Sequence, residues 1–155
     1  MQRMQTALAA AGSAARIIAL SQTARRAADA ATALGCPLGA IVKSLVFSVD
    51  DQPVMALISG DRCCVSKILP QLTGLEGRVS RADADAVRAA TGYAIGGVPP
   101  LGHPSPLPTV IDGALQRFDA IYAAAGHSHC VFGTTLDELV RLSGGAVNDD
   151  VGQDL

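Results

Sequence analysis

The sequence predicts a mixed α/β fold of the α+β type, in which a mainly antiparallel mixed sheet is flanked by helices. Short turns join the extended apolar segments of the first half, whereas capped helical segments separate those of the second half. The chain has 155 residues, of which 49% are hydrophobic, so it can bury one core, and it shows no internal repeat. We therefore expect a single domain over residues 1–147 and a disordered tail over residues 148–155.

The first part of the chain predicts a helix, a strand and a second helix. Residues 2–11 place aliphatic side chains at helical spacing and precede a glycine, and residues 15–20 have the composition of a strand. Thr23 is a candidate N-cap for the second helix. That helix is expected to end at Gly35, with Pro37 just beyond it.

Residues 41–49, IVKSLVFSV, are the strongest strand signal, and the turn that follows leads into residues 54–59 to form an antiparallel hairpin. Lys43 interrupts the apolar pattern, so its side chain lies either on a solvated face or in a cleft. The chain has two lysines and ten arginines, so a chemical role for this ammonium group is one interpretation, and an ordinary solvated lysine is the other. The adjacent Ser44 should face the other way, which argues against a Ser-Lys hydrolase.

The middle of the chain predicts short elements. Residues 62–65 have the composition of a strand, and residues 66–72 predict a brief helical turn. Ser80 with Asp83 resembles a capping box for a helix that runs from residue 81 or 82 to Thr91.

The last third predicts strands over residues 109–111 and 119–124 and around residues 131–132. A capping box formed by Thr135 and Glu138 begins the final helix.

Residues 92–103, GYAIGGVPPLGH, form the most distinctive stretch. Residues 93–95 have the composition of a strand end, Gly96 and Gly97 permit unusual backbone angles, and the prolines beyond them fix the chain. Such a rigid loop can aim backbone amides at a carbonyl or an anion, as an oxyanion hole does. A tight turn between two strands is the structural alternative.

Composition excludes several classes of protein. The chain has no Trp, two Tyr and three Phe, which disfavours capture of single strands by base stacking, and its pI near 5.8 disfavours a DNA-binding protein. Residues 1–81 hold nine basic and five acidic groups, whereas residues 82–155 hold three and nine. Either the first half meets a polyanion, or the two sets of charges interleave in the folded protein. No 18-residue apolar span or signal-peptide core occurs. We expect a cytoplasmic protein that does not bind membranes and whose four cysteines are reduced thiols.

Known chemical motifs are mostly missing. His127, His129 and Cys130, with His103 as a fourth ligand, lack the paired spacing of zinc sites, so we expect no metal. A Cys130 nucleophile beside a histidine would need neighbouring side chains on one face of a strand. Walker and Rossmann glycine patterns are absent, so no nucleotide cofactor is expected.

Four segments together resemble the YbaK family of aminoacyl-tRNA deacylases, to which the editing insertion of prolyl-tRNA synthetase also belongs. The segments are LGCPLGAIVKSLVF, VMALISGD, TGYAIGGVPPLGH and AAAGHSHCVFGTTLDELVRLSGG. The resemblance spans roughly Leu8 to Val147, and its most specific part is the strand lysine combined with the Gly-x-x-x-Pro loop.

The resemblance implies roles for particular residues. Lys43 matches the lysine that positions the aminoacylated end of the tRNA, and the loop amides of Gly96 and Gly97 would hold the substrate carbonyl. The family's water is activated with help from the terminal ribose hydroxyl of the tRNA, so no cofactor and no protein triad is required. Possible contacts to the substrate come from the rest of the loop and from nearby polar residues, namely Val98, Pro99, Pro100, Ser44, His103, Asp112, His127 and His129.

The implied function is trans-editing, the hydrolysis of the ester in a mischarged tRNA. The resemblance points to tRNA(Pro) or a related tRNA carrying alanine, serine, threonine, cysteine or 2-aminobutyrate, with a synthetase as a possible partner. A synthetase pocket separates amino acids that differ by one methylene by only about 1 to 3 kcal/mol, which is why a second, hydrolytic sieve is needed. Two alternatives stay open: a non-catalytic module that binds the tRNA end or a partner, and a small-molecule hydrolase that uses Cys130.

Overall fold

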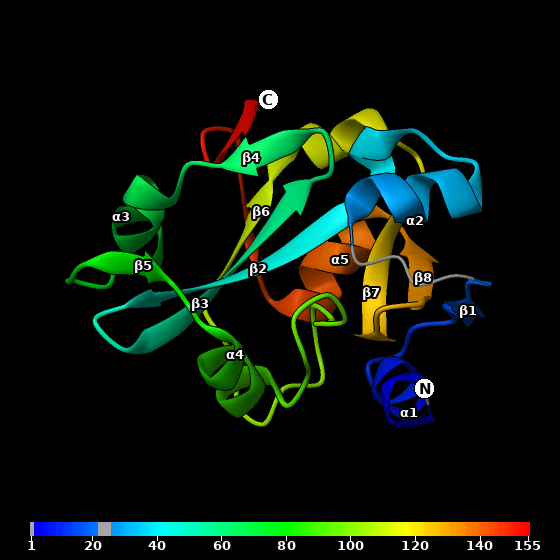
Figure 1. Cartoon of the computed structure of the whole chain (residues 1–155), viewed down its shortest axis with the longest axis horizontal. Helices are drawn as coiled ribbons and strands as arrows, with labels where there is room; N and C mark the ends of the chain where they lie inside the picture. Colours follow the sequence, from blue (N-terminus) through cyan, green and yellow to red (C-terminus); the bar gives the residue numbers. More distant parts are fainter. Residues whose placement is uncertain (1, 22–25) are drawn as a thin grey trace.

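A long hairpin runs through the middle of the computed structural model, which describes residues 2–21 and 26–155 (Figure 1). Strands β2 (Val42–Val49) and β3 (Gln52–Ser59) form this hairpin through the predicted turn. Asp50 and Asp51 both have positive φ there, a conformation that aspartate tolerates better than most residues. The hairpin prediction is therefore confirmed.

The described strands form three sheets. The largest has the order β5-β2-β3-β6-β9, with β2 antiparallel to β3 and β5, and with β6 parallel to β3 and β9. A second antiparallel sheet has the order β1-β8-β7, and β10 pairs with β4 in a third. The bounds are β1 (Ile17–Ala19), β4 (Arg62–Cys64), β5 (Val79–Arg81), β6 (Thr109–Asp112), β7 (Ile121–His127), β8 (Cys130–Thr134), β9 (Ala146–Asn148) and β10 (Gly152–Asp154).

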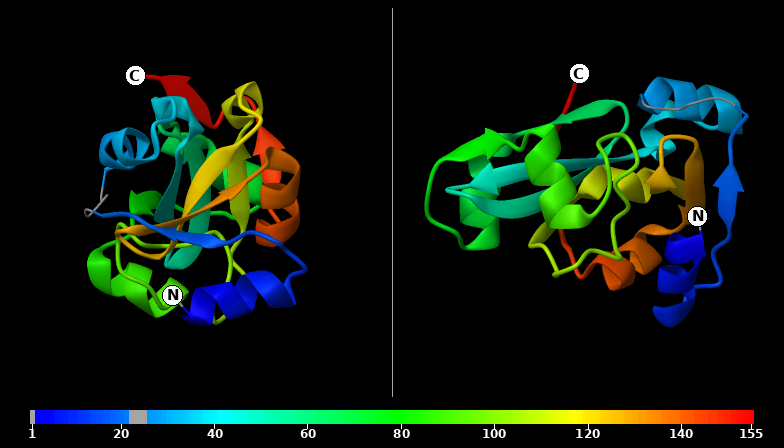
Figure 2. Two further views of the ribbon diagram at one scale, coloured as in Figure 1. Left: turned by 90° about the vertical axis from the view of Figure 1, so that its right-hand side faces the viewer. Right: turned by 60° about the horizontal axis from the view of Figure 1, so that its bottom comes forward.

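Helices flank these sheets, as the fold class predicted from the sequence requires. Helix α3 and helix α4 gather near the turn of the long hairpin, while α2 lies at its other end with β7, β8 and β1 (Figure 1). Figure 2 shows β1 on the outer side of the small sheet. The helices are α1 (Gln2–Ala10), α2 (Ala27–Leu34), α3 (Leu69–Thr73), α4 (Ala84–Thr91) and α5 (Leu136–Ser143), with 3-10 turns η1 (Leu38–Ala40), η2 (Ser66–Ile68) and η3 (Gly113–Arg117).

Strand β3 is buried on both faces and joins two parts of the core. Met55 and Leu57 belong to a cluster that includes α1, β7, β8 and α5, whereas Val54 and Ile58 belong to a cluster that includes α3. Because successive strand side chains point to opposite faces, this alternation lets one strand serve both clusters. None of the helices in the described part of the chain has the length and apolar character needed to cross a membrane.

The helix N-termini test the N-cap residues that the sequence predicted. Thr135 accepts from the Glu138 amide at 3.2 Å, which confirms the start of α5. Helix α4 begins later than predicted, because Asp83 rather than Ser80 is the N-cap and accepts from the Ala86 amide at 2.8 Å. Ser80 instead pairs with β2 as part of β5. Thr23, the predicted cap of the second helix, lies outside the described residues.

Two predictions of irregular or extended structure are wrong. Residues 93–95 do not form a strand: they follow the helix end at Gly92 as bends and turns, and the Thr91 hydroxyl accepts from the Tyr93 amide at 3.1 Å. Residues 148–155 are not a disordered tail, because β9 extends to Asn148 and β10 pairs with β4. Val151 between them is completely buried.

Packing of the C-terminal segment, residues 148–155, should contribute to the free energy of unfolding. Val151→Ala should lower the free energy of unfolding by about 2 kcal/mol, because it opens a cavity in the core cluster around β3 and α3. The matched control is Val147→Ala, since Val147 is 44% exposed and its loss should cost less than about 0.5 kcal/mol. Chemical denaturation measures both, and equal small effects would mean that residues 148–155 do not pack on the domain.

Candidate active site

A cavity of about 340 Å³ lies where the large sheet meets the small sheet. Its wall is built from β2, α2, the loop that follows α4, and the hairpin of β7 and β8. An isolated parallel bridge between Ile41 and Tyr122 joins the two sheets at this point. Segments far apart in the sequence therefore meet around one space.

Lys43 contributes to the cavity wall, which decides between the two placements that the sequence left open. Its side chain is half-buried, and its Nζ donates to the backbone carbonyl of Arg62. Ser44 also lines the cavity, although the alternation of strand side chains predicted that the two residues would separate. The Ser44 hydroxyl is buried and has no hydrogen-bond partner within the described residues. A bound polar ligand could satisfy it.

Gly96 and Gly97 are both required in the loop, but for different structural reasons. Gly96 has φ of +95°, which strains any other residue. Gly97 lies against the backbone of His127, where a Cβ would come within 2.9 Å of main-chain atoms. The Gly97 amide donates to the Ala94 carbonyl at 3.0 Å, so it already has a partner. The Gly96 amide has no acceptor in the described part of the chain, which makes it the available donor of the predicted pair.

Beyond Gly97, Val98 reaches the cavity wall, and the residues after it fix the loop. Val98 lines the wall and is buried, whereas Pro99 and Pro100 are buried outside it. His103 Nε2 donates to the Pro99 carbonyl at 2.7 Å and so ties the loop to itself. Burial lowers the pKa of His103 below its ordinary value of 6.5, which favours the neutral ring in that position.

The two histidines of the β7–β8 hairpin differ in position. His127 lines the cavity, whereas His129 does not, and their ring centroids are 3.9 Å apart. Cys130 pairs with His127 across the hairpin, lines the cavity and is 1% exposed. Within residues 2–21 and 26–155, no group of three or more His, Cys, Asp or Glu side chains is placed to hold a metal ion.

Asp112 does not line the cavity, contrary to its candidate role in substrate binding. Its carboxylate is completely buried and forms an ion pair with Arg62 at 3.1 Å. It also accepts from the Ser59 amide at 3.2 Å. The residue therefore belongs to an internal polar network rather than to the cavity wall.

Two charged residues of the cavity wall were not among the site candidates from the sequence. Arg26 and Arg81 join Lys43 on the wall, while none of the described lining residues is acidic. Such a surface favours a ligand that carries negative charge. Their positions depend on long-range folding, since Arg26 precedes α2 and Arg81 ends β5, and no local motif marks either residue.

Comparison with known proteins gives the family. The model of the aminoacyl-tRNA editing domain matches residues 21–142, which include both Lys43 and the glycine-proline loop. The chain belongs to this family. The resemblance found in the sequence is thus confirmed, and the fold class is confirmed with it.

Individual proteins and solved structures are similar to most of the chain. The chain is 32% identical over 127 residues to YwhH, an uncharacterised protein of Bacillus subtilis (strain 168), covering 81% of this chain and 80% of that protein. It is 38% identical to a solved structure described as a candidate trans-editing enzyme for prolyl-tRNA synthetase, with a TM-score of 0.89 and coverage of 96% and 94%. The hypothetical protein APE2540 is 28% identical, with a TM-score of 0.87 and coverage of 97% and 99%.

The contact between His103 and the loop predicts a pH dependence of stability. Since the folded pKa of His103 is lowered, the unfolded chain binds more protons than the folded chain just below pH 6.5. The free energy of unfolding should therefore decrease as the pH falls from 7 through this window. His103→Gln should reduce the slope, because glutamine can donate to the same carbonyl but does not titrate.

Urea denaturation between pH 5 and 7, in wild type and His103→Gln, measures this slope. His127 and His129 are present in both proteins, so the difference isolates His103. Identical slopes would show that His103 is not buried against the loop.

Proposed function

We propose that this protein is a trans-editing aminoacyl-tRNA deacylase, which hydrolyses the ester between a wrong, small amino acid and its tRNA. The observation that supports this most directly is that Lys43 and Gly96 come from distant segments and line one cavity. The cavity thus offers a cation and an available backbone amide to the same ligand. An ester of an anionic polynucleotide has a carbonyl for the amide and a ribose-phosphate end for the cation.

In the proposed reaction, water attacks the ester carbonyl carbon while the Gly96 amide stabilises the negative charge that develops on the carbonyl oxygen. The bond from that carbon to the ribose oxygen then breaks, and the ribose oxygen takes up a proton. The products are the free amino acid and the intact tRNA. Lys43 orients the ribose and phosphate end, and the terminal ribose hydroxyl helps to activate the water, as the family resemblance implies.

The volume of the cavity and the description of one solved relative support a particular class of substrate. A cavity of about 340 Å³ lies at the small end of the range for ligand pockets, so the acyl group that enters beside the terminal nucleoside should be small. We propose alanine, serine, threonine, cysteine or 2-aminobutyrate on tRNA(Pro) or a related tRNA. The relative described as a candidate trans-editing enzyme for prolyl-tRNA synthetase supports this choice and makes a synthetase a reasonable partner.

The charge of the chain bears on how tRNA would be recruited. The net charge is −2, so phosphate contacts rest on local cations such as Arg26 and Arg81 rather than on the whole surface. Affinity for tRNA should therefore be modest and should fall as salt rises. We propose that the protein works in the cytoplasm, where tRNAs are charged, that it needs no metal, and that neither DNA nor a membrane is its target.

A non-catalytic module that binds the tRNA end is the second candidate. The observation that favours it is the Gly97 amide, which donates to Ala94 and leaves Gly96 as the available donor of the pair. A single donor holds a carbonyl but gives less stabilisation to an oxyanion than a pair of donors. Binding of an aminoacylated tRNA end without release of the amino acid would select this candidate.

A panel of tRNAs mischarged with each small amino acid tests the proposed function. Purified protein should release at least one amino acid from tRNA(Pro) or a related tRNA faster than spontaneous hydrolysis does. Release that stops after thiol alkylation would instead support a Cys130 nucleophile, because Cys130 also lines the cavity. No release for any pair would overturn the proposal.

The proposed roles predict the effects of two substitutions. Lys43→Ala and Gly96→Ala should each lower the deacylation rate about 100-fold, because each removes or displaces a group that contacts the reacting end. Lys67→Ala is the matched control, since Lys67 is the other lysine of the chain and is exposed outside the cavity. It should deacylate at the wild-type rate.

Circular dichroism and thermal melting check that each variant is folded before rates are compared. Near-wild-type rates for both Lys43→Ala and Gly96→Ala would remove these residues from the site.

A further inference from the structure

The ammonium of Lys43 is held by a neutral group. Its Nζ donates to the backbone carbonyl of Arg62, and no carboxylate forms an ion pair with it among the described residues. A carbonyl fixes the direction of the ammonium without neutralising its charge. The position of Lys43 in the cavity therefore depends on what fixes the main chain at Arg62.

Acceptors from β6 and β10 anchor the side chain of Arg62. It is 16% exposed, and its guanidinium donates from Nε to Asp112 Oδ2 at 3.1 Å. Nη1 donates to Asp154 Oδ1 at 2.8 Å, and Nη2 donates to the Gly152 carbonyl at 2.5 Å. Three acceptors from β6 and β10 thus hold one planar group.

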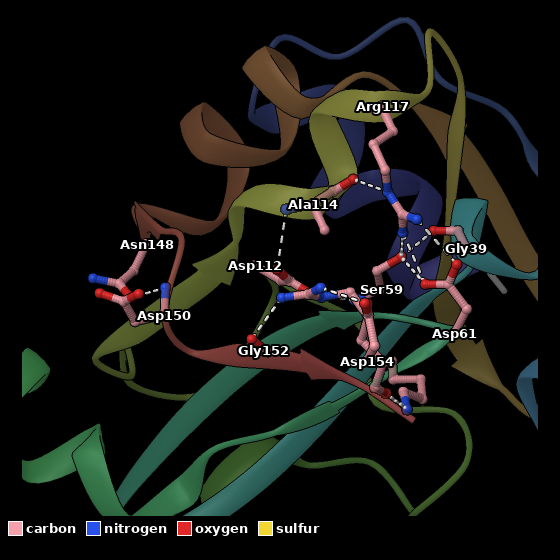
Figure 3. Close-up of polar contacts among 12 residues, drawn as sticks. Gly39, Ser59, Asp61, Asp112, Ala114, Arg117, Asn148, Asp150, Gly152 and Asp154 are labelled. Carbon is pink, nitrogen blue, oxygen red and sulfur yellow. Dashed lines mark hydrogen bonds and ion pairs between the residues drawn. The ribbon is translucent and has the colours of Figure 1, made fainter.

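Asp112 is itself immobilised. It accepts from the Ser59 amide through Oδ2 and from the Ala114 amide through Oδ1, at 3.2 Å and 3.0 Å. Gly152 lies so close that a Cβ there would come within 2.5 Å of Oδ2, so strand β10 packs directly on the carboxylate. Figure 3 shows Asp112, Gly152 and Asp154 converging from two strands.

We propose that Asp112 and the C-terminal strand β10 position Lys43 through Arg62. They are positioning residues, because none of them lines the cavity and all of them act on the reaction through the Arg62 carbonyl. The catalytic part of this inference rests on the proposed deacylase function. The inference gives a role to the buried Arg62–Asp112 ion pair and to strand β10. Neither lines the cavity, so neither contacts the ligand directly.

The arrangement requires an arginine. A guanidinium presents several donors in a fixed plane and can reach both carboxylates and the carbonyl together, whereas an ammonium reaches fewer of them at once. Arg62→Lys keeps a cation beside the buried Asp112 but loses the connection to β10. The backbone carbonyl at position 62 remains, so any change at Lys43 comes from its displacement.

The kinetic test compares Arg62→Lys with a matched control. Arg62→Lys should lower kcat for hydrolysis of the mischarged tRNA about tenfold with little change in KM, because a misplaced group costs rate more than binding. The control is Arg141→Lys, since Arg141 also binds a backbone carbonyl and a carboxylate but lies on α5 away from the cavity. Its kcat should stay at the wild-type value.

A double-mutant cycle separates positioning from general loss of stability. In the Lys43→Ala background, Arg62→Lys should cause no further loss of kcat, because the group that it positions is gone. The same fold loss in both backgrounds would overturn the proposal, since it would show that Arg62 acts independently of Lys43.

A labelling experiment tests the inference even if the protein deacylates none of the tRNAs. An amine-reactive acylating reagent with peptide mapping by mass spectrometry gives the rate at Lys43 relative to Lys67, which serves as the internal reference. Arg62→Lys should raise this ratio several-fold because the hydrogen bond to the carbonyl is weakened, and Arg141→Lys should leave it unchanged. An unchanged ratio in Arg62→Lys overturns the positioning role, whereas a raised ratio without any turnover overturns only the deacylase function.

If Arg62→Lys does not fold, Asp154→Ala takes its place in all three measurements. The Asp154 side chain is 88% exposed, so its removal leaves the core intact while freeing one end of the guanidinium. Smaller changes in the same directions support the proposal, and no change in the labelling ratio overturns it.

Discussion

The contact between the backbone of Gly97 and the backbone of His127 determines how the site is assembled. A Cβ at position 97 would come within 2.9 Å of the main chain of β7, so this approach requires glycine. The contact seats the glycine-proline loop on the small sheet, while Lys43 comes from the large sheet. The cavity exists because two sheets and one loop meet, and each residue that fixes the loop, such as His103, preserves it.

Charge inside the cavity is unbalanced, and the fold maintains that imbalance. Lys43, Arg26 and Arg81 contribute to its wall, and none of the described lining residues is a carboxylate. Asp112 and Asp154 are engaged by the Arg62 side chain, while Asp29 forms an ion pair with Arg26 at 3.6 Å. The ammonium of Lys43 therefore keeps its charge for a ligand, and a buried ion pair serves to place it rather than to neutralise it.

The sequence was sufficient for features that local chemistry determines, such as the β2–β3 hairpin and the Thr135 cap of α5. It failed at Tyr93 to Ile95, where strand-forming residues follow a helix end and find no partner strand. It also failed for the C-terminal segment, since polar residues there are ordered by pairing with β4. The candidate site divides in the same way. The family motif singled out Lys43 and Gly96, which both line the cavity, whereas Asp112 lies outside it because its partner, Arg62, is distant in sequence.

The central claim is that the cavity receives an aminoacylated tRNA end with its carbonyl on the Gly96 amide. A crystal structure with a non-hydrolysable aminoacyl-adenosine, in which an amide replaces the ester, tests this most directly. The account predicts that the carbonyl oxygen of the analogue accepts from the Gly96 amide and that Lys43 lies at its ribose end. An analogue bound outside the cavity, or with its carbonyl turned away from Gly96, would contradict it.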